Sequence, residues 1–379
     1  MPGPTRHFFK ILTRFDEAYT YICNMTVDYL IIGQGISGTW LSYFLQKENQ
    51  SFCVIDNHEA LASSRIAAGV INPVTGRRHV EVWLADVLFP FIKKVYKEIS
   101  IAIGTSVFEQ KNIIDFFPSP QMRESFLQRV AEKNSYLKDY TDENTFQSDF
   151  NFEFHCGEIK PVYTVLLEKL LPLWQQVLKN KNQFVEENFD IHKLQITSDA
   201  IRYNDITARK IIFCDGVNAT NNPYFHRLPF APNKGEAIWL DIPSLSKTFI
   251  YKKGMMLVPL ADTGKWWLGS SYAWDFEHPH PTEIFRKKAE SLLQNWLKIP
   301  FTILDHKASI RPATIERRPF VGFHPLFPQI GILNGLGTKG CSLAPYFARQ
   351  MVDFLLFEKP IQADANISRF AGILSRSVE

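Results

Sequence analysis

VDYLIIGQGISG, residues 27–38, joins a short apolar run to three glycines in the spacing Gly-x-Gly-x-x-Gly. The apolar run predicts a buried strand, the residues after Gly38 predict a helix, and Phe52–Ile55 predicts a second strand that ends at Asp56. In such a unit the first glycine permits a tight turn and the second lets the backbone approach a diphosphate. The third glycine lets the helix pack closely on the sheet. The stretch therefore predicts a dinucleotide-binding βαβ unit.

The start of this predicted helix is the expected diphosphate site. Unpaired N–H groups and the helix dipole favour negative charge there. Asp56 stands where a carboxylate would hold a ribose hydroxyl, which argues against a ligand with a 2′-phosphate. The residues that we expect at the ligand from this unit are Gly33, Gly35, Ile36, Ser37, Gly38, Asp56 and Asn57.

Length and composition limit the class of protein. A chain of 379 residues with 45% hydrophobic residues has room for about two domains. A formal net charge of +3 gives no support to nucleic-acid binding. Five scattered cysteines without a CxxC pair suit a reducing cytoplasm and argue against a structural zinc site. No apolar run reaches the roughly 18 residues of a membrane span. We therefore expect a cytoplasmic protein without a membrane span or a metal.

The first 24 residues contain five charged residues between Arg6 and Glu17, which argues against an export signal. Met25 directly precedes the first predicted strand. Two interpretations stay open for the residues before it. Either these residues are a mis-assigned start or a disordered extension, or they form a short amphipathic helix over about 8–21.

The later sequence alternates between two patterns. Residues 81–101 and 161–179 predict helices, and Lys210–Cys214 predicts a buried strand before the sharp turn at Gly216. Strand candidates at 236–241, 249–251, 255–259 and 266–270 predict an antiparallel sheet. The chain then returns with a strand at 330–334 and a helix from about Ala344 to Phe357, with Pro345 in its first turn.

These patterns predict a fold of the α/β plus α+β class. A Rossmann domain would be built from 26–80, 155–227 and 306–379, after an extension at 1–25. A substrate domain would be built from 81–154 and 228–305.

Two features late in the chain suggest chemistry. Gly335-Leu-Gly-Thr-Lys-Gly340 again places a helix start where backbone donors can stabilise an anion, such as the N1–C2=O edge of a reduced flavin. Lys339 could add positive charge there or pair with a substrate carboxylate. Arg311, followed by Pro312, is suited to a bidentate carboxylate contact. The structural alternatives are a turn that closes the domain and an interdomain ion pair.

Taken together, the motifs resemble the D-amino-acid-oxidase family of FAD-dependent oxidoreductases, above all its glycine oxidase and sarcosine oxidase branch. The end of the chain is also similar to the oxidase half of a bifunctional enzyme that modifies a wobble uridine in tRNA. The resemblance runs from about Val27 to Leu356. It rests on the glycine triplet, Asp56, Ser63–Pro73, Lys234-Gly-Glu236, Arg311-Pro312, Arg318–Gly322 and Asn334–Pro345.

The resemblance implies a glutathione-reductase-like FAD domain beside an antiparallel-sheet domain. We expect noncovalent FAD, since Ala313 stands roughly where the sarcosine branch has its flavin-attaching cysteine. Arg311 would hold a substrate carboxylate, and either Tyr251 or Tyr272 is a candidate for the substrate pocket. The cofactor residues implied are Ser64 at the pyrophosphate, Gly69 and Val70 at the flavin ring, Val185 near the adenine, Gly216, and Gly335, Gly337, Thr338 and Lys339 at the pyrimidine edge.

The activity implied is oxidation of the C–N bond of a small amino acid or secondary amine that carries a carboxylate. Arg311 and Lys339 would orient the anion, hydride would pass to flavin N5, the imine would hydrolyse, and oxygen or another acceptor would reoxidise the flavin. Two alternatives remain: a carboxymethylaminomethyl-modified tRNA base as substrate, or a non-catalytic FAD-binding subunit of a larger amine dehydrogenase. A homo-oligomer stays open as a partner.

Overall fold

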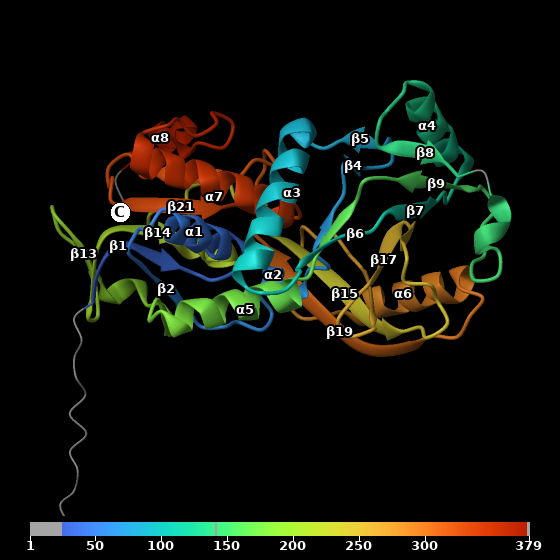
Figure 1. The fold of residues 1–379 in the computed structure, drawn as a ribbon, viewed down its shortest axis with the longest axis horizontal. Helices are drawn as coiled ribbons and strands as arrows, with labels where there is room; N and C mark the ends of the chain where they lie inside the picture. Colours follow the sequence, from blue (N-terminus) through green and yellow to red (C-terminus); the bar gives the residue numbers. More distant parts are fainter. Residues whose placement is uncertain (1–24, 141, 377–379) are drawn as a thin grey trace, which may run out of the picture.

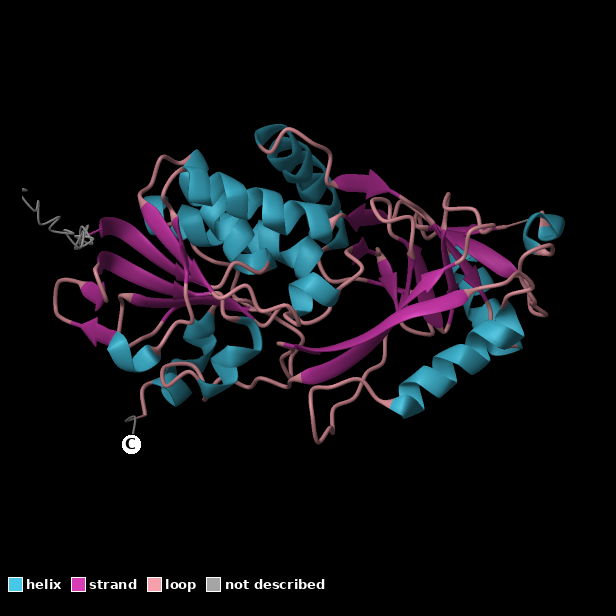
Figure 2. Cartoon of the chain, turned by 90° about the horizontal axis from the view of Figure 1, so that it is seen from below, coloured by secondary structure: helices cyan, strands magenta, loops and turns pink. Residues whose placement is uncertain are grey.

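The computed structural model describes residues 25–140 and 142–376, which form two large sheets and two small ones (Figure 1). In Figure 1, β1 (Met25–Ile32) and the chain from residue 340 onward lie in one half, while β15 (Asn233–Asp241) lies in the other half. Figure 2 shows the strands of the two halves as separate groups. The predicted α/β plus α+β class is confirmed. Residues 1–24, for which the sequence left two interpretations, lie outside the described residues.

The nucleotide-binding sheet has a parallel core of five strands. Along β1, Tyr29 and Ile31 face one apolar core, and Leu30 and Ile32 face another. The strand reads as a continuous apolar run because both of its faces are buried. The parallel strands, in spatial order, are β11 (Phe184–Glu186), β2 (Phe52–Asp56), β1, β14 (Ile206–Phe213) and β21 (Ile330–Asn334). Antiparallel strands β13 (Ile201–Tyr203), β12 (Leu194–Ile196) and β20 (Phe320–Phe323) extend this sheet.

Four helices share the core on one side of this sheet: α1 (Ile36–Lys47), α3 (Ala85–Ala102), α5 (Leu167–Asn180) and α7 (Gly340–Phe357). Trp40 of α1 packs edge-on against Tyr96 of α3, with ring centroids 4.9 Å apart. The sequence placed α3 in the substrate domain, within 81–154. Its aromatic face instead completes the nucleotide-binding layer.

Helix α7 begins at Gly340, four residues before the predicted start, so Pro345 is not in its first turn. A proline there has no N–H for the carbonyl of Cys341, one turn earlier. The hydroxyl of Tyr96 donates to that carbonyl instead, at 2.8 Å. A residue from another helix thus satisfies the acceptor and lets the helix run through Pro345.

The second sheet has the strand order β19-β15-β18-β17-β16-β7-β9-β8. Most pairs are antiparallel, as predicted, but β7 and β16 run parallel. Helix α6 (Glu283–Trp296) covers one face and buries Phe285 and Trp296 with Trp266 of β18. The remaining strands of this sheet are β7 (Ile113–Phe116), β8 (Leu137–Asp139), β9 (Cys156–Ile159), β16 (Ile250–Lys253), β17 (Met255–Pro259), β18 (Trp266–Gly269) and β19 (Thr302–Arg311).

The predicted domain boundaries at 154/155 and 305/306 differ from the ends of this sheet. Strand β9 lies in the second sheet because it pairs with β7, and β19 continues along β15 as far as Arg311. The boundaries were placed from changes of pattern, whereas these pairings are long-range. Three short strands between the sheets, β3 (Val70–Ile71), β10 (Tyr163–Val165) and β6 (Phe108–Gln110), form a small third sheet. Strand β10 therefore occupies the first part of the segment predicted as helix at 161–179.

Apart from α4, the remaining α-helices and strands have at most four residues. None of the helices within 25–140 and 142–376 combines the length and apolar character needed to cross a bilayer. These remaining elements are α2 (Ser63–Ile66), β4 (Val74–Thr75), β5 (Val80–Glu81), α4 (Pro120–Ala131) and α8 (Ala371–Leu374).

Candidate functional site

The glycine-rich turn after β1 is closely packed. Gly33 has φ +97°, and a Cβ there would lie 2.5 Å from the carbonyl oxygen of Cys214. A Cβ on Gly38 would lie only 1.9 Å from the carbonyl oxygen of Gly33. Both contacts involve backbone atoms that cannot move aside cheaply. Only glycine fits at either position, so α1 starts directly against the ends of β1 and β14.

The start of α1 presents its amides without an acidic residue in its first turn. Its N-cap, Gly35, has no side chain to accept from that turn, whose residues Ile36 and Ser37 are uncharged. The hydroxyl oxygen of Ser64 accepts from the N–H of Ile36 at 3.0 Å. Ser64 thus lies at the helix start, where the resemblance predicts the pyrophosphate. Free donors together with the helix dipole suit an anion.

Asp56 at the end of β2 fixes this turn from the other side. One carboxylate oxygen accepts from the N–H of Gln34 at 2.6 Å, and the other accepts from the N–H of His58 at 2.7 Å. Arg65 lies 3.7 Å from the second oxygen and is largely buried. The sequence prediction included Asp56 but missed Arg65, although it directly follows Ser64. A cation here sits beside the expected ribose and diphosphate, and burial lowers the pKa of the Arg65 guanidinium.

The neighbouring strand supplies the expected adenine side. Val185 on β11 pairs with Ile55, one residue before Asp56, and is half-buried. Asn57 donates to the side-chain oxygen of Asn188 at 2.5 Å, so its amide already has a protein partner. The structure thus keeps Val185 at the end of β2 and commits Asn57 to a loop contact.

A second helix start converges on the first. A Cβ on Gly340, the first residue of α7, would lie 3.1 Å from the Cγ2 atom of Ile36 in α1. The loop before α7 contains Gly335 at φ +75° and Gly337 at φ +54°, and its Thr338 is exposed. This left-handed backbone lets the loop fold back, so that the N–H of Gly337 donates to the carbonyl of Pro312 at 3.1 Å. That contact joins the glycine loop to the segment beginning with Arg311.

Lys339 caps α7 without a side-chain hydrogen bond. Burial lowers the pKa of its ammonium group, and the nearby charges of Arg318 and Arg317 lower it further. Among the described residues, Lys339 forms no ion pair. It therefore stands as an uncompensated cation at a helix start, which suits an electron-rich or anionic partner.

The ends of β14 and β21 are joined by a polar cluster. Asn334 donates to the carboxylate of Asp215 at 3.0 Å and to the carbonyl of Gly216 at 2.9 Å, and it accepts from the N–H of Gly335 at 2.8 Å. Burial raises the pKa of the Asp215 carboxyl from its ordinary 3.8 to about 7. Gly216 has φ +60°, and a Cβ there would meet open space.

Gly69 directly precedes β3 of the small third sheet, and Val70 is the first residue of that strand. A Cβ on Gly69 would lie 2.0 Å from the carbonyl oxygen of Val165, and Val70 pairs with Thr164. The close approach requires glycine. The backbone that the resemblance places at the flavin ring is therefore held by β10 of the small third sheet.

These observations fit FAD. The diphosphate would be held at the start of α1 by the amides of the glycine turn, with Ser64 and Arg65 beside it. The pyrimidine edge of the flavin would lie at the start of α7, next to Lys339. Both positions supply the donors and positive charge that these parts of the molecule require.

On the substrate side, Arg311 ends β19 directly opposite Asn233, the first residue of β15. Its Nη1 donates to the side-chain oxygen of Asn233 at 2.5 Å. Its Nη2 donates to the hydroxyl of Ser270 at 2.7 Å and to the carbonyl of Ser271 at 3.2 Å. Arg311 forms no ion pair among the described residues. The alternative of an interdomain ion pair thus finds no partner there. Burial lowers the pKa of the guanidinium.

The two candidate substrate tyrosines separate clearly. The Arg311 guanidinium lies over the ring of Tyr272, 4.8 Å from its centroid, and Tyr272 is 62% exposed. Tyr251 is 1% exposed, packs in the apolar core beneath α6, and donates its hydroxyl to the carbonyl of Ser246 at 2.9 Å. The geometry therefore favours Tyr272 for the substrate pocket and assigns Tyr251 to the core.

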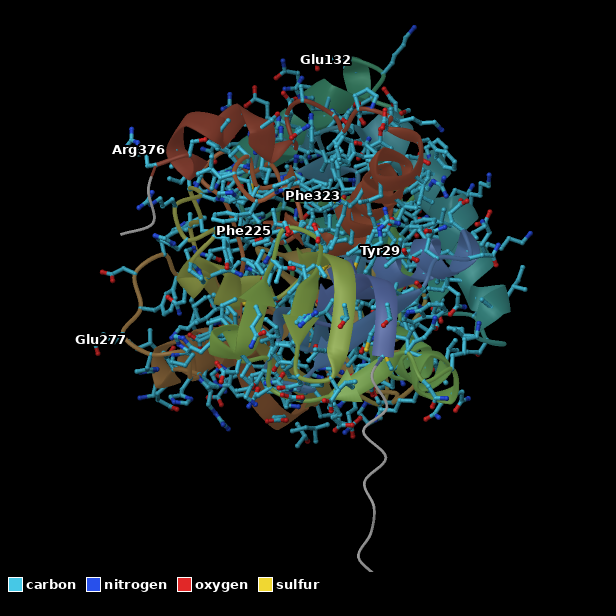
Figure 3. The ribbon with its side chains drawn as sticks, turned by 90° about the vertical axis from the view of Figure 1, so that its left-hand side faces the viewer. Tyr29, Glu132, Phe225, Glu277, Phe323 and Arg376 are labelled. Atoms are coloured by element: carbon cyan, nitrogen blue, oxygen red, sulfur yellow. The ribbon has the colours of Figure 1, made fainter. Side chains whose placement is uncertain are left out.

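The segment 271–282 is tied down from the reverse face of β15. Both oxygens of the Glu236 carboxylate are bound by Thr282, through its N–H at 2.6 Å and its hydroxyl at 2.9 Å. Lys234 donates to the carbonyls of His278 and His280 at 3.2 and 3.1 Å. Figure 3 shows Glu277 of this segment standing away from the body of the molecule. These contacts hold the end of the segment at residues 278–282, and backbone hydrogen bonds between Lys234 and Ala273 hold the end next to Tyr272.

A family model described as DAO, FAD dependent oxidoreductase, matches residues 165–354. Among solved structures, a glycine oxidase from Bacillus cereus ATCC 14579 superposes with a TM-score of 0.73 at 15% identity, over 93% of this chain and 99% of that one. An iminodiacetate oxidase from Chelativorans sp. BNC1 gives a TM-score of 0.72 at 16% identity, over 90% and 98%. An L-proline dehydrogenase from P. horikoshii gives 0.73 at 15%, over 92% and 98%.

Proposed function

This chain belongs to the DAO family of FAD-dependent oxidoreductases, and from that premise we propose that it oxidises the C–N bond of a small amine that carries a carboxylate. The cofactor is FAD. The observation that carries the proposal is Arg311: a largely buried guanidinium without an ion-pair partner among the described residues, held in one orientation by Asn233 and Ser270. An uncompensated buried cation of this kind suits an anionic ligand.

The neighbourhood of Arg311 favours binding of an amino acid over a simple amine. The carboxylate would lie at Arg311, next to the exposed ring of Tyr272. The loop that carries Lys339 is joined to the Arg311 segment by the hydrogen bond between Gly337 and Pro312. When bound, FAD supplies the acceptor for the two electrons of the C–N bond. Arg311 and Lys339 supply positive charge, which lowers the pKa of a bound ammonium group and so favours the neutral amine that can be oxidised.

The descriptions of the similar structures support an amine substrate, but the substrates that they name differ. The three similar structures are described as acting on glycine, iminodiacetate and L-proline, each of which bears a carboxylate next to the C–N bond. The exact substrate, and whether oxygen or another acceptor reoxidises the flavin, stay open within the proposal.

The proposal is tested by the visible spectrum of the flavin under anaerobic conditions. Three matched pairs separate the carboxylate from the amine: glycine with methylamine, sarcosine with dimethylamine, and L-proline with pyrrolidine. We expect at least one carboxylate member to bleach the oxidised band and its partner to leave the band unchanged. An Arg311→Ala variant should retain FAD and lose about 100-fold in kcat/KM for the carboxylate substrate.

Two results would contradict the proposal. Equal bleaching by both members of a pair would show that oxidation does not require the carboxylate. A spectrum unchanged by every small amine, including a wider set of D-amino acids, would shift attention to the sequence alternatives, a modified tRNA base or a partner chain that carries out the turnover.

A further inference from the structure

Asn233 lies beside Arg311 in a position that the fold alone does not explain. The two residues are direct partners across the antiparallel pair β15–β19, so their side chains share one face of the sheet. Gly235 follows two residues later on the same face and leaves the space across which the guanidinium lies. Asn233 is 1% exposed. Its amide is thus a buried polar group next to the expected substrate carboxylate.

One half of this amide has a partner and the other half lacks one. The oxygen accepts from Nη1 of Arg311 at 2.5 Å. The nitrogen, Nδ2, is buried and has no hydrogen-bond partner among the described residues. Buried polar groups in proteins are nearly always hydrogen-bonded, since leaving one unpaired costs free energy. The unpaired Nδ2 indicates an acceptor that the chain itself does not supply.

Arg311 cannot serve a carboxylate with all of its donors. A guanidinium has five N–H donors, and acceptors from the protein already meet both of its Nη atoms. Nη2 donates to both Ser270 and Ser271, so its donors are used before a ligand arrives. Bidentate contacts of a carboxylate that require Nη2 are therefore not available. A carboxylate that meets Arg311 through one oxygen therefore needs a second donor for its other oxygen.

We propose that Asn233 is that second donor and so determines the specificity for a carboxylate, an inference that rests on the proposed function. Arg311 donates to one oxygen of the substrate carboxylate, and Nδ2 of Asn233 donates to the other. The same amide fixes the guanidinium through its oxygen. Replacement of the amide by a carboxylate would remove the donor, compensate the charge of Arg311 and repel the substrate anion.

The test compares Asn233→Asp with Asn144→Asp in the FAD-loaded protein. Asn144 is exposed in the second domain, in the short turn after Asp142, and its replacement adds the same charge away from the site. For whichever carboxylate amine proves active, we expect KM to rise about 100-fold in Asn233→Asp with kcat changed much less, and no change in Asn144→Asp. The matched amine without the carboxylate should become the better substrate of Asn233→Asp.

A binding measurement that does not depend on turnover accompanies the kinetics. Acetate and propionate, titrated calorimetrically against the FAD-loaded protein, should bind the wild type and Asn144→Asp but not Asn233→Asp. Asn233→Ala, which removes the donor without adding charge, should weaken acetate binding about tenfold. This milder variant keeps the inference testable if Asn233→Asp does not retain FAD.

The outcomes separate this inference from the proposed function. If Arg311→Ala abolishes carboxylate binding while both Asn233 variants bind acetate like the wild type, the role of Asn233 is refuted and the carboxylate site stands. If Arg311→Ala also binds acetate normally, both fall together. If Arg311→Ala and Asn233→Asp lose acetate binding and Asn233→Ala weakens it, both are supported.

Discussion

The guanidinium of Arg311 lies directly against Gly235, so closely that a Cβ on Gly235 would come within 1.8 Å of Nη2 and 2.2 Å of Cζ. The contact joins β15 and β19, the two longest strands of the second sheet. Glycine is required there by the space that the guanidinium occupies. In the Lys-Gly-Glu motif at 234–236, the glycine thus leaves the space that Arg311 occupies. The side chains of Lys234 and Glu236 bind the segment 271–282 on the opposite face of β15.

Replacement Gly235→Ala should displace Arg311 without disturbing the FAD domain. Because the methyl group and Nη2 cannot occupy the same space, the guanidinium must move by about an ångström or more. Displacements of this size cost on the order of 100-fold in catalysis. We expect kcat/KM for the carboxylate amine to fall by about that factor, measured at unchanged FAD content.

The matched control for that variant is Gly372→Ala. Gly372 lies in α8, and a Cβ there would meet no atom within 4 Å. It should show wild-type kinetics. Wild-type kinetics in Gly235→Ala as well would mean that Arg311 tolerates displacement and does not position the substrate.

Replacement Gly38→Ala should abolish FAD binding. Its Cβ would clash with the carbonyl oxygen of Gly33, which belongs to the turn itself, so α1 would be pushed away from the diphosphate site. Gly340→Ala offers a graded comparison, because its Cβ would meet a side-chain methyl group of Ile36 at 3.1 Å. The absorbance ratio of flavin to protein should be near zero in the first variant and reduced only partly in the second. Equal FAD content in both would contradict the assignment of the glycine turn.

The strands around the cofactor could be predicted from sequence because their signals are local. The apolar run of β1 and the glycine triplet lie within 12 residues, and each has a known geometric meaning. The start of α7 could not be predicted in the same way. Pro345 indicates a helix start when read alone. Only the contact between Cys341 and Tyr96, 245 residues apart in the chain, allows the helix to begin before the proline.

The substrate side depends even more on long-range pairing. Arg311 could be predicted from its type and from Pro312, but its partner Asn233 is defined by the register of β15 against β19. The motif Lys234-Gly-Glu236, which follows Asn233 directly, supports the resemblance but does not mark Asn233 itself as part of a site. The choice between Tyr251 and Tyr272 also depends on long-range pairing, because that pairing decides which strand end lies beside Arg311.

The stability of the protein should depend on pH through Asp215. Burial raises the pKa of this carboxyl from 3.8 to about 7, so the folded protein holds the proton more tightly than the unfolded chain. Its ionisation therefore lowers the free energy of unfolding progressively as pH rises from about 4 to 7, and the loss is complete above that range. Asp215→Asn removes this dependence while keeping an acceptor for Asn334.

The measurement is denaturant unfolding of wild type and Asp215→Asn at pH 5 and pH 7. From pH 5 to pH 7, the free energy of unfolding of the variant should rise by on the order of 2 kcal/mol relative to that of the wild type. Each pH unit within the window contributes about 1.4 kcal/mol. Titration of histidines cancels in the difference between the two proteins. A difference that does not change with pH would show that the Asp215 carboxyl is ionised across this range.

Tyr96→Phe should destabilise the protein because it leaves the carbonyl of Cys341 without the donor that replaces the missing N–H of Pro345. Tyr96 is completely buried, so water cannot easily take its place, and the expected loss in the free energy of unfolding is about 1–3 kcal/mol. In the double variant with Pro345→Ala, the backbone N–H gained at position 345 can donate to Cys341 within the helix. In the Tyr96→Phe background, Pro345→Ala should therefore restore much of the lost free energy of unfolding. In the wild type, the same replacement should increase the free energy of unfolding only a little. Additive effects of the two replacements in urea unfolding would show that the tyrosine hydroxyl and the proline are not coupled, and that α7 passes Pro345 for another reason.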